Sequence, residues 1–270
     1  MKRKIHLHCP LLKTDANKPQ EECKLKSLQI YPFVHPEKKI LLSATSDAET
    51  IRLSREDNRV NLPSVSKILK ETMPPERKTA LEVWEERMKA ELGLDGFLKM
   101  HEDTLQRGIC LHSAIERYFF DGSLPDPKDI QDDISRNHLS SIAPILASFH
   151  RPPLAIESQV IHPDLDYVGY FDALTFIGHT AIMIDWKTSK KDKLSLRATF
   201  DAPLQVAAYA GALNHDARYP FQVEAAMIVV VYNDGQKATM LKVNKLQLQK
   251  HWVQWLERCK LYKQLMAKKV

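Results

Sequence analysis

The chain has 270 residues, 44% hydrophobic and 27% charged, with a net charge of +5. This is an ordinary globular composition, sufficient for one large domain or two small ones. No stretch approaches the roughly 18 to 20 apolar residues of a membrane span, so a membrane protein is not expected. The modest positive charge permits a polyanionic partner without requiring one.

The four cysteines are scattered along the chain, at Cys9, Cys23, Cys110 and Cys259. Zinc sites and iron–sulfur clusters usually draw on closely spaced cysteine pairs, and this chain has none. We therefore expect neither type of site. Free thiols in a reducing compartment are the simplest interpretation.

Residues 1–60 are rich in lysine, proline and polar side chains, which predicts an extended, partly disordered N-terminal arm. A folded domain is expected over 61–270. Its first portion, 61–150, has the pattern of helices. Its second portion, 151–270, has the pattern of a sheet core followed by a C-terminal helix.

Three helices are predicted in the first portion, and a weaker helical segment is expected after the turn-rich residues 121–128, as far as Phe149. Ser64 is suited to cap the first, and the second runs from Pro75 to a stop at Gly93. The second helix carries a stripe that includes Trp84 and Met88, which we expect to be core. The third is expected over about 102–120, with Gly108, His112 and Glu116 stacked on one face at intervals of four.

The second portion alternates strands with helices, which indicates an α/β fold with a mixed central sheet flanked by helices. Gly178 and His179 are suited to turn two of the strands into a hairpin. The expected strands are Leu154–His162, Tyr167–Ile177, Thr180–Lys187, Val223–Tyr232 and Ala238–Val243, and the expected helices are Ala202–Leu213 and Lys245–Lys268.

An acid and an amine end the third of these strands. Asp185 and Lys187 are two residues apart, so a strand places both side chains on one face. The hairpin would bring Asp172 close to Asp185. Two crowded carboxylates repel unless a cation lies between them, and oxygen ligands are those that Mg²⁺ prefers. A magnesium site with a lysine beside it is therefore predicted.

Four motifs occur in order: G-x-x-x-H-x-x-x-E at 108–116, G-x-x-D at 169–172, D-x-K-T at 185–188 and Q-x-x-x-Y at 205–209. Together they resemble the PD-(D/E)xK nuclease superfamily, and within it the RecB-like branch. The resemblance covers about residue 63 to the C-terminus. It implies a restriction-endonuclease-like core and a metal-dependent nuclease.

The resemblance also implies roles for single residues. His112, Asp172 and Asp185 would hold the metal, with the backbone carbonyl of Trp186 as a further ligand and the Trp186 side chain on the far side of the sheet. Lys187 would position the attacking water. Mg²⁺ suits a mostly oxygen shell, and the histidine nitrogen makes Mn²⁺ plausible as well. The supporting or DNA-binding candidates are Glu116, Glu157, Thr188, Lys190, Lys191, Gln205 and Tyr209.

Some of these residues have a structural alternative. His112 could be a histidine satisfied by Glu116 one turn away, and Gln205 and Tyr209 could be packing residues. Lysine-rich segments could be solvated helix faces rather than phosphate contacts.

Details of the match are similar to mitochondrial exonucleases of this branch. They imply hydrolysis of single-stranded DNA or flap ends by a mitochondrial monomer, with replication proteins as possible partners. A structure-specific endonuclease of the same fold and a catalytically silent single-stranded-DNA-binding module are the alternatives. The silent module is disfavoured because every motif position is filled.

Overall fold

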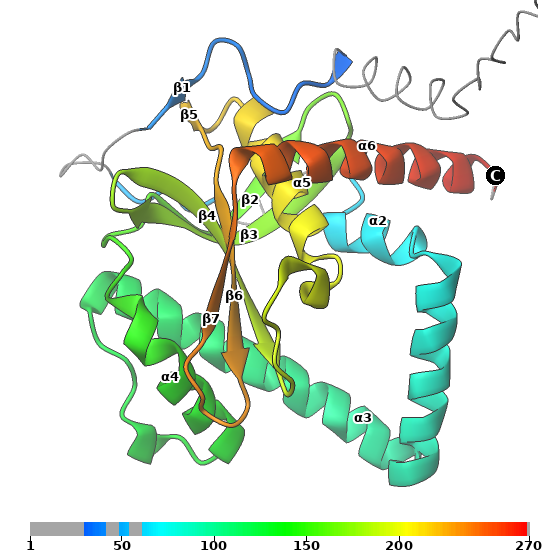
Figure 1. Cartoon of the computed structure of the whole chain (residues 1–270), viewed down its shortest axis with the longest axis vertical. Helices are drawn as coiled ribbons and strands as arrows, with labels where there is room; N and C mark the ends of the chain where they lie inside the picture. Colours follow the sequence, from blue (N-terminus) through cyan, green and yellow to red (C-terminus); the bar gives the residue numbers. More distant parts are fainter. Residues whose placement is uncertain (1–29, 42–48, 54–60, 269–270) are drawn as a thin grey trace, which may run out of the picture. The chain divides into compact units, whose positions relative to one another are not determined.

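A five-stranded mixed sheet forms the centre of the protein, in the order β2-β3-β4-β6-β7 (Figure 1). The computed structural model describes residues 30–41, 49–53 and 61–268. The strands are β2 (Ala155–His162), β3 (Tyr167–Ile177), β4 (Thr180–Ser189), β6 (Ala226–Tyr232) and β7 (Thr239–Val243).

The sheet has one parallel pair, β4 with β6, and its other neighbours are antiparallel. The predicted hairpin between β3 and β4 is confirmed, and Gly178 supplies the turn with a φ of 58°. A parallel pair needs a crossover, which here contains helix α5 (Ala202–His215). Strand β6 is buried along its whole length because it is central and covered on both faces.

Helices cover both faces of the sheet. On one face, α5 contacts β2, β3, β4 and β6 and packs against α6 (Lys245–Ala267). On the other face, apolar side chains of α3 (Pro75–Asp121) and α4 (Asp133–Leu146) share a core with β4 and β6. The predicted α/β class with a mixed, helix-flanked sheet is therefore confirmed.

The helical portion begins with α2 (Val65–Glu71). Ser64 caps the N-terminus of this helix, because its hydroxyl accepts a hydrogen bond from the N–H of Lys67. Helix α3 follows, with a sharp break at Gly93, where φ is 71° and ψ is 169°. The predicted stop at Gly93 is confirmed. The predicted start of the next helix near residue 102 is wrong, because helical structure resumes directly after Gly93. Residues 97–100 are Phe, Leu, Lys and Met, which are all compatible with a helix. The helix therefore breaks at Gly93 alone and continues in a new direction directly after it.

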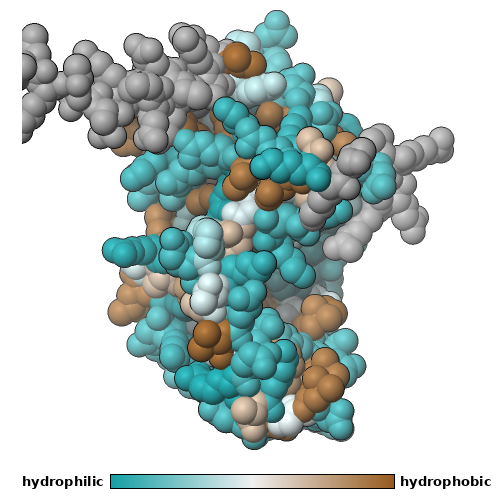
Figure 2. Space-filling model, turned by 90° about the vertical axis from the view of Figure 1, so that its right-hand side faces the viewer, coloured by the Kyte–Doolittle hydropathy of each residue, from teal (hydrophilic) through white to brown (hydrophobic). Residues whose placement is uncertain are grey.

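The expectation that the stripe around Trp84 and Met88 is core is wrong. Leu81 and Leu92 of this stripe are exposed, and Trp84 and Met88 are half-buried. Trp84 instead contacts Phe97 across the Gly93 break, at a ring separation of 6.4 Å. The side of the molecule that Figure 2 shows is largely hydrophilic with separate hydrophobic patches. In the described part of the chain, the ring contacts of Trp84 are with Phe97 and His101 of the second arm of α3, which offer too little apolar surface to cover the stripe.

Most of the predicted N-terminal arm lies outside the described residues. The parts that are described make ordered contacts: β1 (Lys39–Ile40) pairs in parallel with β5 (Phe221–Gln222), and Ile51 bridges to Ala155. The chain divides into two units, 1–32 and 33–270, and the second holds nearly all described residues. Two short helices complete it, η2 (Pro127–Asp129) and η3 (Leu196–Thr199).

Within the described part of the chain, no helix combines the length and apolar character needed to cross a membrane. Two of the four cysteines lie there, and both Cys110 and Cys259 are free thiols.

Candidate active site

Strand β4 presents Asp185 and Lys187 on one face of the sheet. Asp185 is almost fully buried and Lys187 is half-buried. The Lys187 Nζ donates to Oδ1 of Asp185 at 2.8 Å and lies 2.7 Å from Oδ2. Trp186, between them, points to the opposite face, where its ring meets Phe149 edge-on at 5.5 Å. The predicted alternation of these three side chains is what the structure has.

Strand β3 brings Asp172 to the same face, beside Asp185. The β3–β4 register pairs Ala173 with Ile184, so the next residues outward, Asp172 and Asp185, are neighbours. The β3–β4 ladder ends before this pair. The N–H of Trp186 donates to the side-chain Oδ2 of Asp172 at 2.7 Å rather than to a backbone carbonyl of β3. The hydrogen bond fixes the orientation of the Asp172 carboxylate. The role expected for the Trp186 carbonyl stays a prediction.

Helix α3 contributes His112 to this cluster. Its Nδ1 lies 2.9 Å from Oε1 of Glu157 and 3.9 Å from Oδ1 of Asp172. One ligand atom from each of His112, Glu157 and Asp172 lies within 4.8 Å of the others, which is a spacing that a single metal ion can bridge. Glu157, rather than Glu116, is thus the carboxylate that contacts the histidine.

Glu157 has an unusual backbone. The β2–β3 register pairs Ile156 with Ala173 and Ser158 with Phe171, which sets Glu157 opposite Asp172, yet this pair is missing from the ladder. Glu157 has a φ of 41°, in the left-handed region that costs a residue with a Cβ roughly 1 kcal/mol or more. The strand interrupts its regular path at the residue that faces Asp172, and strain of this kind is typical of functional sites.

The charged groups of the cluster lie close enough to shift one another's pKa values. Burial and the nearby Asp185 raise the pKa of Asp172 to about 7. Burial opposes the charge of Lys187, but attraction to Asp185 and Asp172 outweighs it and raises the lysine pKa. Burial likewise opposes the charge of His112, while the hydrogen bond to Glu157 and attraction to Asp172 raise its pKa overall. Asp185 therefore destabilises the charge of Asp172, which a further cation would relieve.

The cluster suits a divalent metal ion by the chemistry of its donors. Oδ2 of Asp185 is buried, and its neighbour among the described residues is the Lys187 ammonium at 2.7 Å, which leaves this oxygen able to accept a further positive charge. Three carboxylates and one imidazole form a hard, mostly oxygen ligand set, which Mg²⁺ and Mn²⁺ favour. His112, Glu157, Asp172 and Asp185 are the side chains that would hold such an ion.

Helix α5 brings Gln205 and Tyr209 towards the carboxylates. Nε2 of Gln205 donates to the Tyr209 hydroxyl at 2.8 Å. Burial, Asp185 and Asp172 raise the pKa of Tyr209, so the phenol stays protonated and acts as a neutral group beside the acids. Tyr209 is buried and Gln205 is half-buried, and a contact with metal, water or substrate stays a prediction for each.

The remaining candidates lie at the edge of the cluster. Glu116 forms an ion pair with Arg52, a residue for which the sequence offered no signal. Thr188 is half-buried at the end of β4. Lys190 and Lys191 are exposed in the loop that follows, where the Ser189 hydroxyl bonds the backbone of Lys191. The two lysines are therefore accessible to an anionic ligand.

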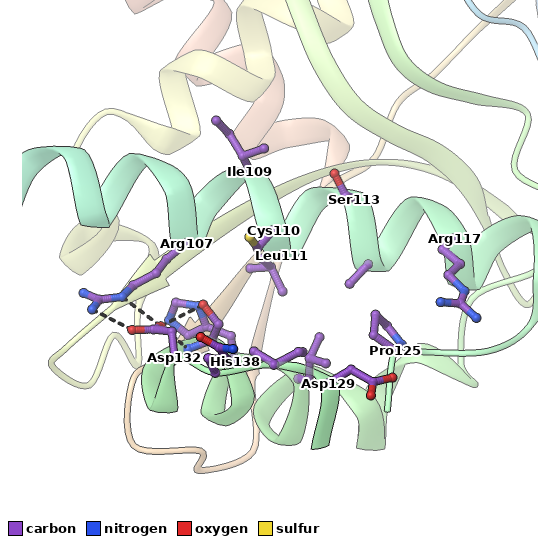
Figure 3. A pocket seen from close by; sticks show the side chains of 15 residues that line it. Arg107, Ile109, Cys110, Leu111, Ser113, Arg117, Pro125, Asp129, Asp132 and His138 are labelled. Carbon is purple, nitrogen blue, oxygen red and sulfur yellow. Dashed lines mark hydrogen bonds and ion pairs between the residues drawn. The ribbon is translucent and has the colours of Figure 1, made fainter. Parts of the chain in front are cut away.

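A separate cavity of 540 Å³ lies between α3 and α4 (Figure 3). It is lined by Cys110 and Leu111 of α3 and by His138 of α4, and Arg107 closes one end through a hydrogen-bonded pair with Asp132, at 2.9 and 3.0 Å. The cavity does not include the proposed catalytic residues.

Comparison with known proteins identifies the relatives of this chain. A mitochondrial genome maintenance exonuclease 1 from Mus musculus is 36% identical over 95% of this chain and 74% of its own length. The chain belongs to the mitochondrial genome maintenance exonuclease 1 family. The family members from Homo sapiens and Xenopus tropicalis are 33% and 38% identical over 86% and 77% of this chain. The chain spans 66% and 59% of their respective lengths.

Membership in the mitochondrial genome maintenance exonuclease 1 family supports an exonuclease role and a mitochondrial location for this chain. No protein-family model matches the chain, so the wider PD-(D/E)xK superfamily stays a prediction from the motifs. Among solved structures, SSO0001 aligns over 66% of this chain and 69% of its own, with 15% identity and a TM-score of 0.35, a similarity too low to define the fold.

Proposed function

We propose that this protein is a divalent-metal-dependent exonuclease that hydrolyses single-stranded DNA from a free end, in the maintenance of the mitochondrial genome. The observation that carries the proposal is the cluster of His112, Glu157 and Asp172 next to the Asp185–Lys187 pair. Family membership supports the exonuclease part. The metal rests on the chemistry of the site, and the single-stranded substrate rests on the resemblance of the motifs to mitochondrial exonucleases.

Hydrolysis of a phosphodiester requires positive charge at the scissile phosphate and a water molecule held in line. A bound divalent ion supplies the charge. Lys187 keeps its ammonium group protonated and is held by Asp185, so its remaining N–H groups can orient a water or neutralise charge that develops on phosphate oxygen. Asp172 is fixed by the Trp186 N–H, which keeps its second oxygen directed to the cluster.

The requirement for a free end is supported by the helices before the sheet. Leu98 and Leu105 on the second arm of α3 are exposed. Leu98, Leu105 and His112 follow one another at intervals of seven residues, so all three lie on the same face of the helix. In Figure 1, α2 and the two arms of α3 run around the region next to η3 and α5. A strand that passed between these helices and α5 would have to enter by an end, and this is the arrangement that we propose.

The test is digestion of matched DNA substrates with and without Mg²⁺. Linear single strands should be degraded to short oligonucleotides, while circular single strands and blunt duplexes survive. Chelation of the metal should stop digestion, and Asp185→Ala should be inactive under all conditions. Rapid nicking of circular single strands would instead establish the endonuclease alternative. Binding without any digestion would establish the silent module.

A further inference from the structure

Phe200 is a large aromatic side chain that packing does not explain. It follows η3 and lies two residues before α5, and 64% of it is exposed. Its φ of 56° and ψ of −116° are unfavourable for a residue with a Cβ. An exposed ring on a strained backbone indicates a position kept for contact with something outside the chain.

Two cations flank this ring. The Arg77 guanidinium lies 5.2 Å from the ring centroid and the Lys193 ammonium 4.4 Å from it. Asp201 anchors Arg77 through a hydrogen bond of 2.5 Å, and Leu194, next to Lys193, is exposed as well. The ring therefore lies in surroundings that are both apolar and positively charged, which suits a nucleotide, with a flat base and an anionic phosphate.

The flanking lysine does not block the ring. An exposed cation–π contact is worth about 0.5–1 kcal/mol, whereas a base stacked on an aromatic side chain is worth roughly 1–3 kcal/mol. A base can therefore displace Lys193 from the ring face. The displaced ammonium remains close enough to pair with the phosphate of the same nucleotide.

The ring is also within reach of the candidate active site. Gln205 and Tyr209 lie five and nine residues further along the chain, and α5 rises about 1.5 Å per residue. Tyr209 is therefore roughly 10 Å along the helix axis from Ala202, the first residue of α5, which follows Phe200 by two residues. Lys193 itself follows β4, the strand that carries Lys187. One short single strand can contact both places.

We propose that Phe200 is a stacking platform for one nucleobase of the single strand, with Arg77 and Lys193 holding the adjoining phosphates. The proposal rests on the proposed function and adds to it a base-contacting subsite without sequence preference, since every base has a flat face. A protein partner docking on the same ring is the competing explanation.

The experiment combines protein variants with single-base deletions in the DNA. Binding of wild type, Phe200→Ala and Phe200→Trp to a short labelled oligonucleotide is measured by fluorescence anisotropy without divalent metal. Phe200→Ala should weaken binding about 10-fold, within the range for loss of one stacked base. Phe200→Trp should retain affinity. Phe120→Ala is the matched control, because Phe120 is also exposed beside an arginine, at the other end of α3 from Arg77.

Abasic sites then identify the stacked nucleotide. Scanning an abasic site along the oligonucleotide should reveal one position where wild type loses about 10-fold in affinity and Phe200→Ala loses nothing further, since the same contact cannot be removed twice. The salt dependence of binding should be the same in Phe200→Ala and wild type, and shallower by about 0.7 in Lys193→Met.

Equal affinity of Phe200→Ala and wild type, or additive losses at every abasic position, would overturn the stacking platform. Digestion assays separate this outcome from a failure of the proposed function. If wild type digests linear single strands and Phe200→Ala has an unchanged KM, only the subsite is wrong. If wild type neither binds nor digests single strands, the proposed function is wrong, and the subsite with it.

Discussion

Gly169 and Tyr209 are in such close contact that residue 169 has no room for a side chain. A Cβ atom at 169 would lie 2.6 Å from Cδ1 and 2.8 Å from Cε1 of the Tyr209 ring. Gly169 belongs to the G-x-x-D motif of β3, and Tyr209 to the Q-x-x-x-Y motif of α5. The glycine thus lets α5 approach the strand that carries Asp172, which brings the two motifs together.

Gly169→Ala should lower the free energy of unfolding by about 1–3 kcal/mol, the usual cost of overpacking a core. Chemical denaturation measures the change. Gly108→Ala is the control: a Cβ there meets nothing within 4 Å, so this variant should be unchanged or more stable, by about 0.5–1 kcal/mol. Combining Gly169→Ala with Tyr209→Ala should relieve the clash, and strictly additive losses in the pair would contradict the contact.

Asp185→Asn and Lys187→Met should each abolish or greatly reduce DNA digestion while the protein stays folded. For Lys187→Met we expect a fall in kcat of roughly 10²–10³-fold, the effect of losing one group that stabilises transition-state charge. Single-turnover digestion with saturating enzyme isolates the chemical step. Lys128→Met is the matched control, because Lys128 is exposed in η2, outside the cluster. Turnover near that of wild type in either site variant would remove the residue from the mechanism.

His112→Asn and Glu157→Gln should weaken metal binding. Both side chains belong to the ligand cluster, and loss of either should raise the Mg²⁺ concentration for half-maximal digestion by about 10-fold or more. Calorimetric titration of Mg²⁺ and Mn²⁺ gives the affinity without activity. His179→Asn in the exposed β3–β4 turn should behave as wild type. Unchanged metal affinity in His112→Asn would return this histidine to a structural role.

Binding to single strands should weaken steeply with salt. Each phosphate neutralised on single-stranded DNA contributes about −0.7 to the slope of log affinity against log salt. Lys190→Met and Lys191→Met should each make the slope shallower by about this amount, since both lysines are exposed beside β4. A flat salt dependence of the wild type would show that phosphate contacts contribute little.

Acid should destabilise the fold through His162. Its imidazole is fully buried, lies between His215 and Trp252, and accepts a hydrogen bond at Nδ1 from the N–H of Leu165. Burial, together with His215, lowers the pKa of His162 to about 3. In the unfolded chain, His162 therefore binds a proton near pH 6.5, whereas in the folded chain it stays neutral until the pH falls towards 3.

The contribution of His162 to stability should be complete above about pH 6.5 and decline as pH falls towards 3, by about 1.4 kcal/mol per pH unit for one proton. Urea unfolding of wild type and His162→Asn between pH 4 and 8 measures it. The variant should lose this part of the pH dependence, and His179→Asn should keep it. Parallel stability curves for wild type and His162→Asn would contradict the assignment.

The order of the helices and strands could be predicted because each of them is determined by residues close together in the sequence. The alternation in β3 and β4, the capping Ser64 and the glycine at 93 each act within a few residues. The burial of the Trp84 stripe could not be predicted, because it depends on whether another element lies opposite. Among the described residues, the rings that meet Trp84 belong to the second arm of α3 itself.

For the site, the four motifs named the side chains but not their pairing. His112 contacts Glu157 rather than Glu116. Glu157 has a positive φ within β2, and the residue pattern of the strand does not predict this local break. Arg52 and Phe200 were missed for a related reason. Both are single residues in irregular segments, where periodicity gives no signal.

The contact of Trp252 with α5 has a consequence for how this chain tolerates shortening. Its indole lies where a Cβ of Gly211 would be, and Trp252 and Trp255 are completely buried. Helix α6 carries none of the proposed catalytic residues, yet it holds α5 in place over the sheet. We therefore expect a premature stop codon between residues 216 and 252 to leave every proposed ligand encoded and still abolish activity, because α5 would lose the helix that packs against it.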